Sequence, residues 1–169
     1  MGNRATVIFT NKDETSISPA IYLHWNGGPE SIYPFLDELD RREVRADQNY
    51  EAARFVAIVS EFFDQDYYSG LSLGIQNGPE EIIPSALKAF DPGDNGIFVV
   101  CRETKPRRVR RFESDYVAGK SSLTDMTPDA VEEERKQAYK SEYLSAIKSL
   151  FTKPNEREAS EARRKAVSK

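Results

Sequence analysis

Residues 21–30 constrain the fold of this chain more than any other stretch, because an apolar run ends there at two consecutive glycines. Apolar and polar side chains alternate with a period of two up to Trp25, which predicts a strand with Trp25 on its core-facing side. The same alternation places Tyr22 and His24 together on the opposite face. The stretch therefore predicts a strand, a tight turn at the glycines and the start of a helix.

Four other short runs have the character of β-strands, because they are rich in β-branched and aromatic residues or alternate in polarity. They are residues 5–10, 71–75, 97–101 and 109–113. The unbroken apolar run 97–101 predicts a central strand covered on both faces. The first run is expected to pair with the strand that ends at Trp25, as a hairpin. The segment 115–126 is predicted to be a loop.

Helical periodicity is present in four stretches, at residues 32–42, 52–63, 83–90 and 128–151. Residues 52–63 carry three phenylalanines on one stripe behind a cap at Asp47 or Asn49, which predicts the central core helix. Pro34 is tolerated only in a first helical turn, where no backbone donor is needed. Thr127, which is followed by proline, marks the start of the last helix.

Together these elements indicate a single α+β domain, with about five mostly antiparallel strands, helices packed on one face, and a C-terminal helix. At 169 residues the chain is long enough for one such domain with its own core. The domain is expected to span residues 1–151, with a core from 2 to 114 and the helix 128–151. Residues 152–169 are charged and small, so we expect a disordered tail there.

The composition also limits the class of protein. No window approaches the ~18 apolar residues of a membrane helix, and no leader pattern opens the chain, so we expect a soluble, cytoplasmic protein without a membrane partner. A single cysteine, Cys101, excludes an intrachain disulfide and a cysteine-rich zinc site. The acidic turn at residues 91–96 lacks the spacing of a calcium loop, so neither a metal nor a cofactor is expected.

Charge is distributed unevenly along the chain. The net charge of −4 argues against general coating of DNA, which requires a positive surface. Residues 102–111 hold six basic side chains against Glu103, a local charge of +5, which leaves −9 for the remainder of the chain. An acidic body with one basic strand is therefore expected.

That basic strand is a candidate surface for a partner. The candidate residues are Arg107, Arg108, Arg110 and Arg111. Alternation places Arg108 and Arg110 on the same face as Phe112, whereas Arg111 falls on the other face with Val109. Two interpretations stay open, because charges on an exposed edge strand prevent edge-to-edge aggregation and also suit an acidic partner, phosphate or nucleic acid.

The turn after Trp25 is a second candidate site. Backbone N–H groups of glycines at a helix start can hold an anion without side chains. The candidates for ligand or anion binding are Tyr22, His24, Asn26, Gly27 and Gly28. The motif lacks the third glycine of a dinucleotide fingerprint, and paired glycines also serve turn geometry alone. His24 is in addition a candidate general acid or base, although no catalytic set of residues accompanies it.

Three motifs carry a family resemblance. They are Gly2-Asn3-Arg4-Ala5, residues 22–28 with Glu30-Ser31 and Phe35-Leu36 after them, and Gly93-Asp94-Asn95-Gly96. In these the chain resembles a family of small uncharacterised proteins of phages, prophages and other bacterial mobile elements, over residues 2–113. The resemblance implies a small cytosolic accessory protein with a counter-defence or host-takeover role, and it carries over no catalytic or binding residue.

Three function hypotheses follow from these features. The first is a non-enzymatic interaction protein of a mobile element, which binds a host protein through the basic strand, the glycine turn or the C-terminal helix. The second is a protein that sequesters a small anion or nucleotide at Gly27 and Gly28. The third is an enzyme that uses His24. The sequence does not determine the oligomeric state.

Overall fold

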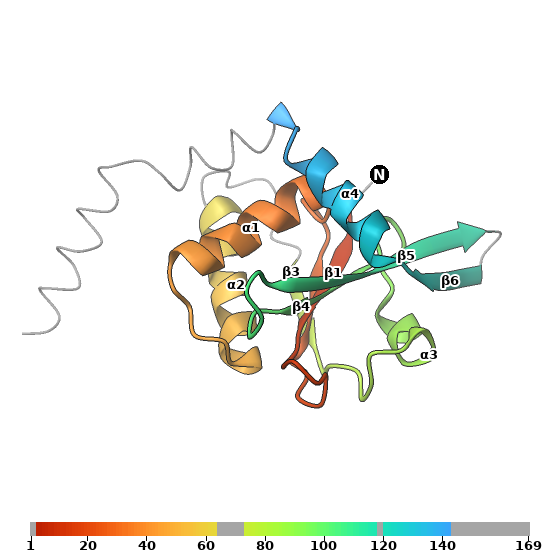
Figure 1. Ribbon diagram of the computed structural model, residues 1–169. Coiled ribbons are helices and arrows are strands. Elements are labelled where there is room, and N and C mark those ends of the chain that lie inside the picture. The colour runs from red at the N-terminus through yellow and green to blue at the C-terminus, as the bar shows by residue number, and fades with distance from the viewer. Residues whose placement is uncertain (1–2, 64–72, 118–119, 143–169) are drawn as a thin grey trace, which may run out of the picture.

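The structure is a computed structural model that describes residues 3–63, 73–117 and 120–142 (Figure 1). Its elements are β1 (Ala5–Phe9), β2 (Ala20–Leu23), α1 (Pro29–Arg41), α2 (Gln48–Phe63), β3 (Leu73–Gln76), α3 (Pro84–Leu87), the 3-10 turn η1 (Lys88–Phe90), β4 (Ile97–Cys101), β5 (Arg108–Val117), β6 (Lys120–Asp125) and α4 (Pro128–Ala138). The predicted single α+β domain with a C-terminal helix is confirmed. The predicted last helix, 128–151, is shorter than expected, because α4 ends at Ala138; residues 143–169, with the expected tail, lie outside the described residues.

The strands form one six-stranded sheet in the order β3-β2-β1-β4-β5-β6. The predicted hairpin is confirmed, because β1 pairs antiparallel with β2. β1 also pairs with β4 in parallel, whereas β4, β5 and β6 follow one another antiparallel. Every residue of β4 is buried, as its unbroken apolar sequence predicts for a strand covered on both faces.

Helices cover the two faces of the sheet unequally. On one face α1 and α2 pack on Val7, Phe9 and Phe98, and the end of α4 joins the same core. On the other face Ile8 and Val99 pack with side chains of α3 and η1. The short α3 therefore departs from the expectation that all helices share one face, and in Figure 1 it lies apart from α1, α2 and α4.

Helix starts follow the capping residues in the sequence. The Asp47 side chain accepts a hydrogen bond from the backbone N–H of Tyr50 at 3.0 Å, which confirms one of the two predicted caps of α2. Thr127 caps α4 in the same way. The position expected for Pro34 is wrong, because α1 begins already at Pro29 and the second proline falls inside the helix, beyond the first turn.

Two further expectations are corrected. Residues 115–126 are not a loop, because β5 continues to Val117 and β6 returns along it. Their mixed polarity hides the strand, since β6 is joined to the sheet by backbone pairing rather than by an apolar stripe. Trp25 is not in the core but 41% exposed. The strand β2 already ends at Leu23, and Asn26 has a left-handed φ of 55°, so the alternation no longer holds at the tryptophan.

No helix in the described ranges is both long and apolar enough to cross a bilayer.

Candidate functional site

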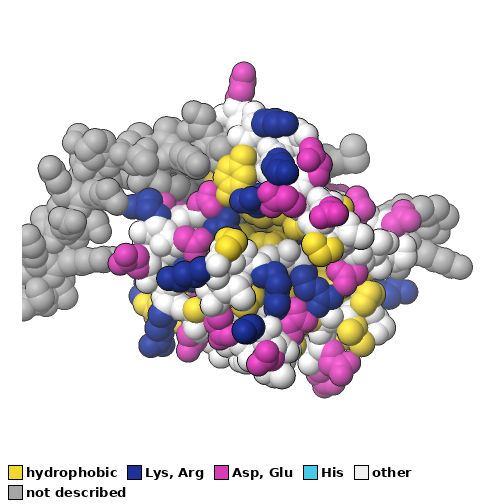
Figure 2. All heavy atoms as spheres, in the orientation of Figure 1, with side chains coloured by type: hydrophobic (Ala, Val, Ile, Leu, Met, Phe, Trp, Pro, Cys, Tyr) yellow, Lys and Arg dark blue, Asp and Glu magenta, His cyan; other side chains and the backbone are white. Residues whose placement is uncertain are grey.

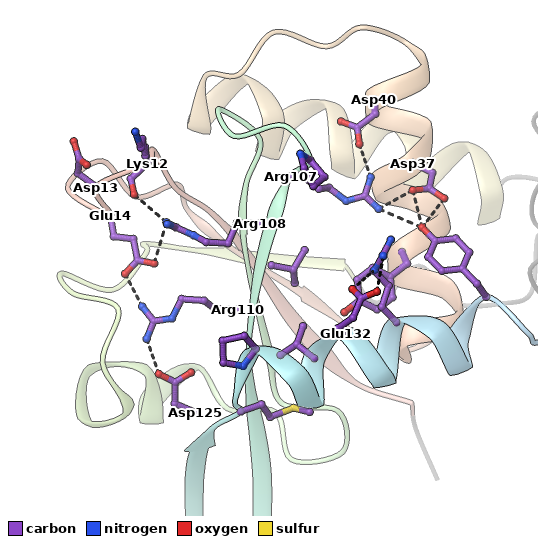
Figure 3. Close-up of a pocket in the computed structure, with 18 residues that line it drawn as sticks. Lys12, Asp13, Glu14, Asp37, Asp40, Arg107, Arg108, Arg110, Asp125 and Glu132 are labelled. Atoms are coloured by element: carbon purple, nitrogen blue, oxygen red, sulfur yellow. Dashed lines mark hydrogen bonds and ion pairs between the residues drawn. The ribbon is translucent and has the colours of Figure 1, made fainter.

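A groove of about 890 Å³ lies along the first half of β5 (Figure 3). Its walls are α1 and the start of α4 on one side, and the turn at residues 12–14 on the other. β5 supplies side chains to both sides: Arg107, just before the strand, points toward α1, whereas Arg108 and Arg110 point toward the turn (Figure 3). The predicted basic strand is therefore the base of a groove.

Arg107 joins the wall formed by α1 to the base of the groove. Its guanidinium donates to Asp37 at 2.6 Å and is also paired with Asp40. Burial lowers the pKa of Arg107, but the two carboxylates outweigh this effect and raise it overall. The hydroxyl of Tyr139 donates to Asp37 at 2.8 Å, and burial together with this carboxylate raises the pKa of Tyr139 to about 12. One carboxylate thus holds the base of the groove and the end of α4 together.

Arg108 and Arg110 are held by the turn on the opposite wall. Arg110 donates to Glu14 and to Asp125, both at 2.6 Å. Arg108 donates to the carbonyl of Lys12 at 2.9 Å and contacts Glu14 at 3.4 Å. Glu14 has a left-handed φ of 57°, which belongs to the tight turn that brings its carboxylate between the two arginines.

Arg111 is part of the interior and does not face a partner. Its side chain is 3% exposed, and its guanidinium lies 3.6 Å from the centre of the Phe98 ring. It donates to the carbonyl of Ile97 at 2.9 Å and is paired with both oxygens of Glu134 on α4. Arg111 therefore attaches α4 to the sheet.

The groove also has apolar surface. Val109 on β5 and Val131 on α4 line it, together with Met126 and Pro128 at the start of that helix. Figure 2 shows apolar side chains at the centre of this face of the molecule, with basic and acidic side chains intermingled around them. An apolar centre surrounded by a polar rim is typical of protein–protein interfaces.

The second candidate site, the glycine turn, lies outside the groove, and other residues of the chain occupy the space and the hydrogen-bonding groups at its glycines. The N–H of Gly27 donates to the carbonyl of Asn3 at 2.8 Å, and a Cβ on Gly27 would lie 2.5 Å from the nitrogen of Ala5. A Cβ on Gly28 would lie 2.2 Å from a carboxylate oxygen of Glu30, so a negative charge already covers the start of α1. The turn closes the end of the sheet.

The motifs of the family resemblance meet at this turn. The N–H of Asn3 donates to the carbonyl of His24 at 3.1 Å, and the side chain of Asn3 is bonded to the amide of Asn95. Arg4 is paired with Asp94 at 2.9 Å. Segments far apart in the sequence are thus joined by a polar network, here called the motif cluster, which comprises Asn3, Arg4, Gly27, Asp94 and Asn95.

Tyr22 on β2 and His24, just after this strand, lie beside the motif cluster. The Tyr22 hydroxyl and Nδ1 of His24 are 2.9 Å apart, and the His24 ring meets the edge of Trp25. Neither residue lines the groove. The structure therefore separates the two sets of sequence candidates, with Arg107, Arg108 and Arg110 at the groove and the turn residues outside it.

Sequence reasoning did not find the acidic partners of the arginines. Asp37 and Asp40 stand one helical turn apart in the sequence, off the apolar stripe of α1, which is a weak signal for an exposed face. Nothing in the sequence links them to Arg107, which is about 70 residues away. Within the described part of the chain no group of three or more histidine, cysteine or acidic residues is placed to hold a metal ion.

Comparison of the chain with protein-family models, with curated proteins and with solved structures found no match.

Proposed function

We propose that this protein works without catalysis, by binding a partner protein in the groove along β5. One observation carries the proposal: a groove with an apolar centre whose arginines are each already held by a carboxylate. Side chains that are ordered before binding lose less conformational entropy when a partner arrives. The groove is thus a preorganised surface.

A host protein is the partner that we propose, in line with the resemblance to mobile-element proteins and the counter-defence or host-takeover role which that resemblance implies. Nucleic acid is a weaker alternative, because phosphates would have to displace Asp37, Glu14 and Asp125 from the arginines. Sequestration of an anion at the glycine turn is also weaker, since Asn3 and Glu30 occupy that turn. A catalytic role of His24 is also weaker, because His24 does not line the groove.

Affinity capture from a bacterial lysate tests the proposal with two matched charge reversals. The variant Arg108→Glu/Arg110→Glu changes the groove wall, whereas Arg45→Glu/Arg54→Glu makes the same charge change near Tyr50 on α2, outside the groove. We expect the wild-type chain and the α2 variant to retain a stoichiometric protein that the groove variant loses, with circular dichroism unchanged. Absence of such a protein, or equal retention by both variants, would contradict the proposal.

A further inference from the structure

The open side of β5 ends where β6 begins to pair. β6 is paired with β5 from Phe112 to Val117, and Met126 extends this pairing to the carbonyl of Arg111. Among the described residues, 108–110 therefore lack a neighbouring strand on that side, whereas their other side is paired with β4. Most of β5 is thus an internal strand of the sheet, and its first residues are an edge.

Backbone hydrogen bonds show which groups face the open side. The N–H of Thr10 donates to the carbonyl of Val100 at 2.9 Å, so Val100 faces β1 and its neighbours face β5. The N–H of Met126 donates to the carbonyl of Arg111 at 2.9 Å, so Arg111 faces away from β4. Because alternate residues of a strand face the same side, the N–H and C=O of Val109 face outward too.

Val109 is therefore a donor and acceptor pair without a backbone partner among the described residues. Val109 lines the groove and is half-buried, so this open edge lies at the groove. Unpaired backbone groups at the edge of a sheet attract another strand.

We propose that the segment bound in the groove is an extended peptide, which adds to the sheet as a strand beside residues 108–110. The inference rests on the proposed function and names the chemistry of the partner. At about 3.3 Å per residue, the open edge is about 10 Å long and lies beside about three residues of the peptide. Main-chain hydrogen bonds to Val109 supply the affinity, as in other strand additions.

Charge complementarity favours this occupant over a polyanion. The groove is lined by five basic and six acidic side chains, and the arginines of β5 are paired with carboxylates on both walls. A surface whose charges cancel suits an uncharged hydrogen-bonding backbone better than a row of phosphates. The edge also lies between α4 and the turn at residues 12–14, which both line the groove.

The two faces of β5 specify the side chains of the peptide. The residue opposite Val109 points to the same face, where Val131 and Met126 are close, and is therefore expected to be apolar. Its two neighbours point toward Arg108 and Arg110, whose charges are already matched, so uncharged polar side chains are expected there. The expected pattern is polar, apolar, polar.

Decapeptides selected from a random display library against the immobilised full-length chain provide the probe. Selected peptides are then resynthesised with one backbone N-methyl group at each position in turn, and their affinities for the wild-type chain are measured by calorimetry. A strand that pairs with Val109 loses at least tenfold in affinity at the position whose N–H is donated to the Val109 carbonyl, and keeps its affinity at the two adjacent positions. Protection of the Val109 amide from hydrogen exchange is expected in the same complex.

A pair of variants tests the edge from the side of the protein. Val109→Pro removes the outward N–H without removing a hydrogen bond to β4, whereas Val109→Ala shortens the side chain and keeps the N–H. We expect the proline variant to lose peptide binding at least tenfold more than the alanine variant. The N-methyl series uses the wild-type chain, so it tests the proposal even if the Val109→Pro variant fails to fold.

Three outcomes would overturn strand addition. N-methyl groups that are tolerated everywhere, or that are equally harmful at adjacent positions, contradict it while leaving groove binding intact if Arg108→Glu/Arg110→Glu still abolishes the interaction. Peptides that bind Arg108→Glu/Arg110→Glu with the same affinity as the wild-type chain bind elsewhere, so the groove would not be the site. A dimer in sedimentation that Val109→Pro dissociates would make a second copy the occupant.

Discussion

The motif cluster and the groove are both built from polar residues, but they use them for different purposes. In the motif cluster, side chains and backbone groups close on one another, and Gly27 leaves no room for an additional atom against Ala5. In the groove the charged side chains close on one another, yet the backbone of Val109 is left open. Residues that form a conspicuous sequence motif can thus have a structural role, while the backbone of an inconspicuous valine offers a binding position for a partner.

The largest effect is expected at Arg111, which divides the basic strand into structural and surface residues. Arg111→Leu leaves Glu134 without its guanidinium partner, and losing one member of a buried pair costs about 3 kcal/mol of unfolding free energy. Arg108→Leu is the control, because an exposed pair contributes about 0.5 kcal/mol. Urea denaturation measures both. Equal losses of unfolding free energy in the two variants would contradict the division into a structural Arg111 and a surface Arg108.

The next effect tests whether the paired glycines serve geometry. Gly27→Ala would place a Cβ against backbone atoms of Arg4 and Ala5 and is expected to cost about 2 kcal/mol. Gly28→Ala is the matched control, because its Cβ meets only the flexible end of Glu30 and its φ of −70° suits any residue. If Gly28→Ala proved the more harmful, the turn would have to bind a ligand or another group at that glycine.

A smaller, pH-dependent effect is expected at Asp94. The hydrogen bond from the Arg4 guanidinium lowers the pKa of Asp94 below its unfolded value, although partial burial opposes this. A lowered pKa stabilises the fold above the unfolded pKa, and this stability is lost as pH falls through the folded pKa. Asp94→Asn should therefore cost about 1 kcal/mol at pH 7 and nothing near pH 2. A difference that persists at low pH would show that the asparagine acts otherwise than through charge.

The smallest effect is expected at His24. Replacing it with phenylalanine removes one hydrogen bond, to Tyr22, so the unfolding free energy should fall by about 1 kcal/mol or less. Partner capture and peptide binding should be unchanged, because His24 does not line the groove. Loss of partner binding in a folded His24→Phe variant would return the turn to the list of functional sites.

Short-range patterns in the sequence were sufficient for much of the fold. Apolar runs predicted β1 and β4, and a capping aspartate with an apolar stripe predicted α2. Alternation also placed Arg108 and Arg110 on the face of Phe112, as the ring contact of Arg110 confirms. The same patterns failed at β6, whose side chains show no apolar stripe, and at Trp25, where the strand had already ended.

The site was less accessible from sequence, for a physical reason. The groove depends on where β6 stops pairing with β5, and on carboxylates of α1 and of the first turn that reach β5 from distant positions. Such contacts arise from tertiary packing, which a local pattern does not record. The arginines could be found as candidates, but their neutralisation and the open edge between them could not.

The hydrogen bond from Tyr139 to Asp37 determines how the groove can vary. Because Asp37 also holds Arg107, the end of α4, the body of α1 and the approach to β5 share a single carboxylate. The wall formed by α1 and α4 then keeps a constant spacing from the base of the groove. Relatives or engineered variants that keep this carboxylate should accept changed side chains in a bound strand while still requiring a main chain of the same width.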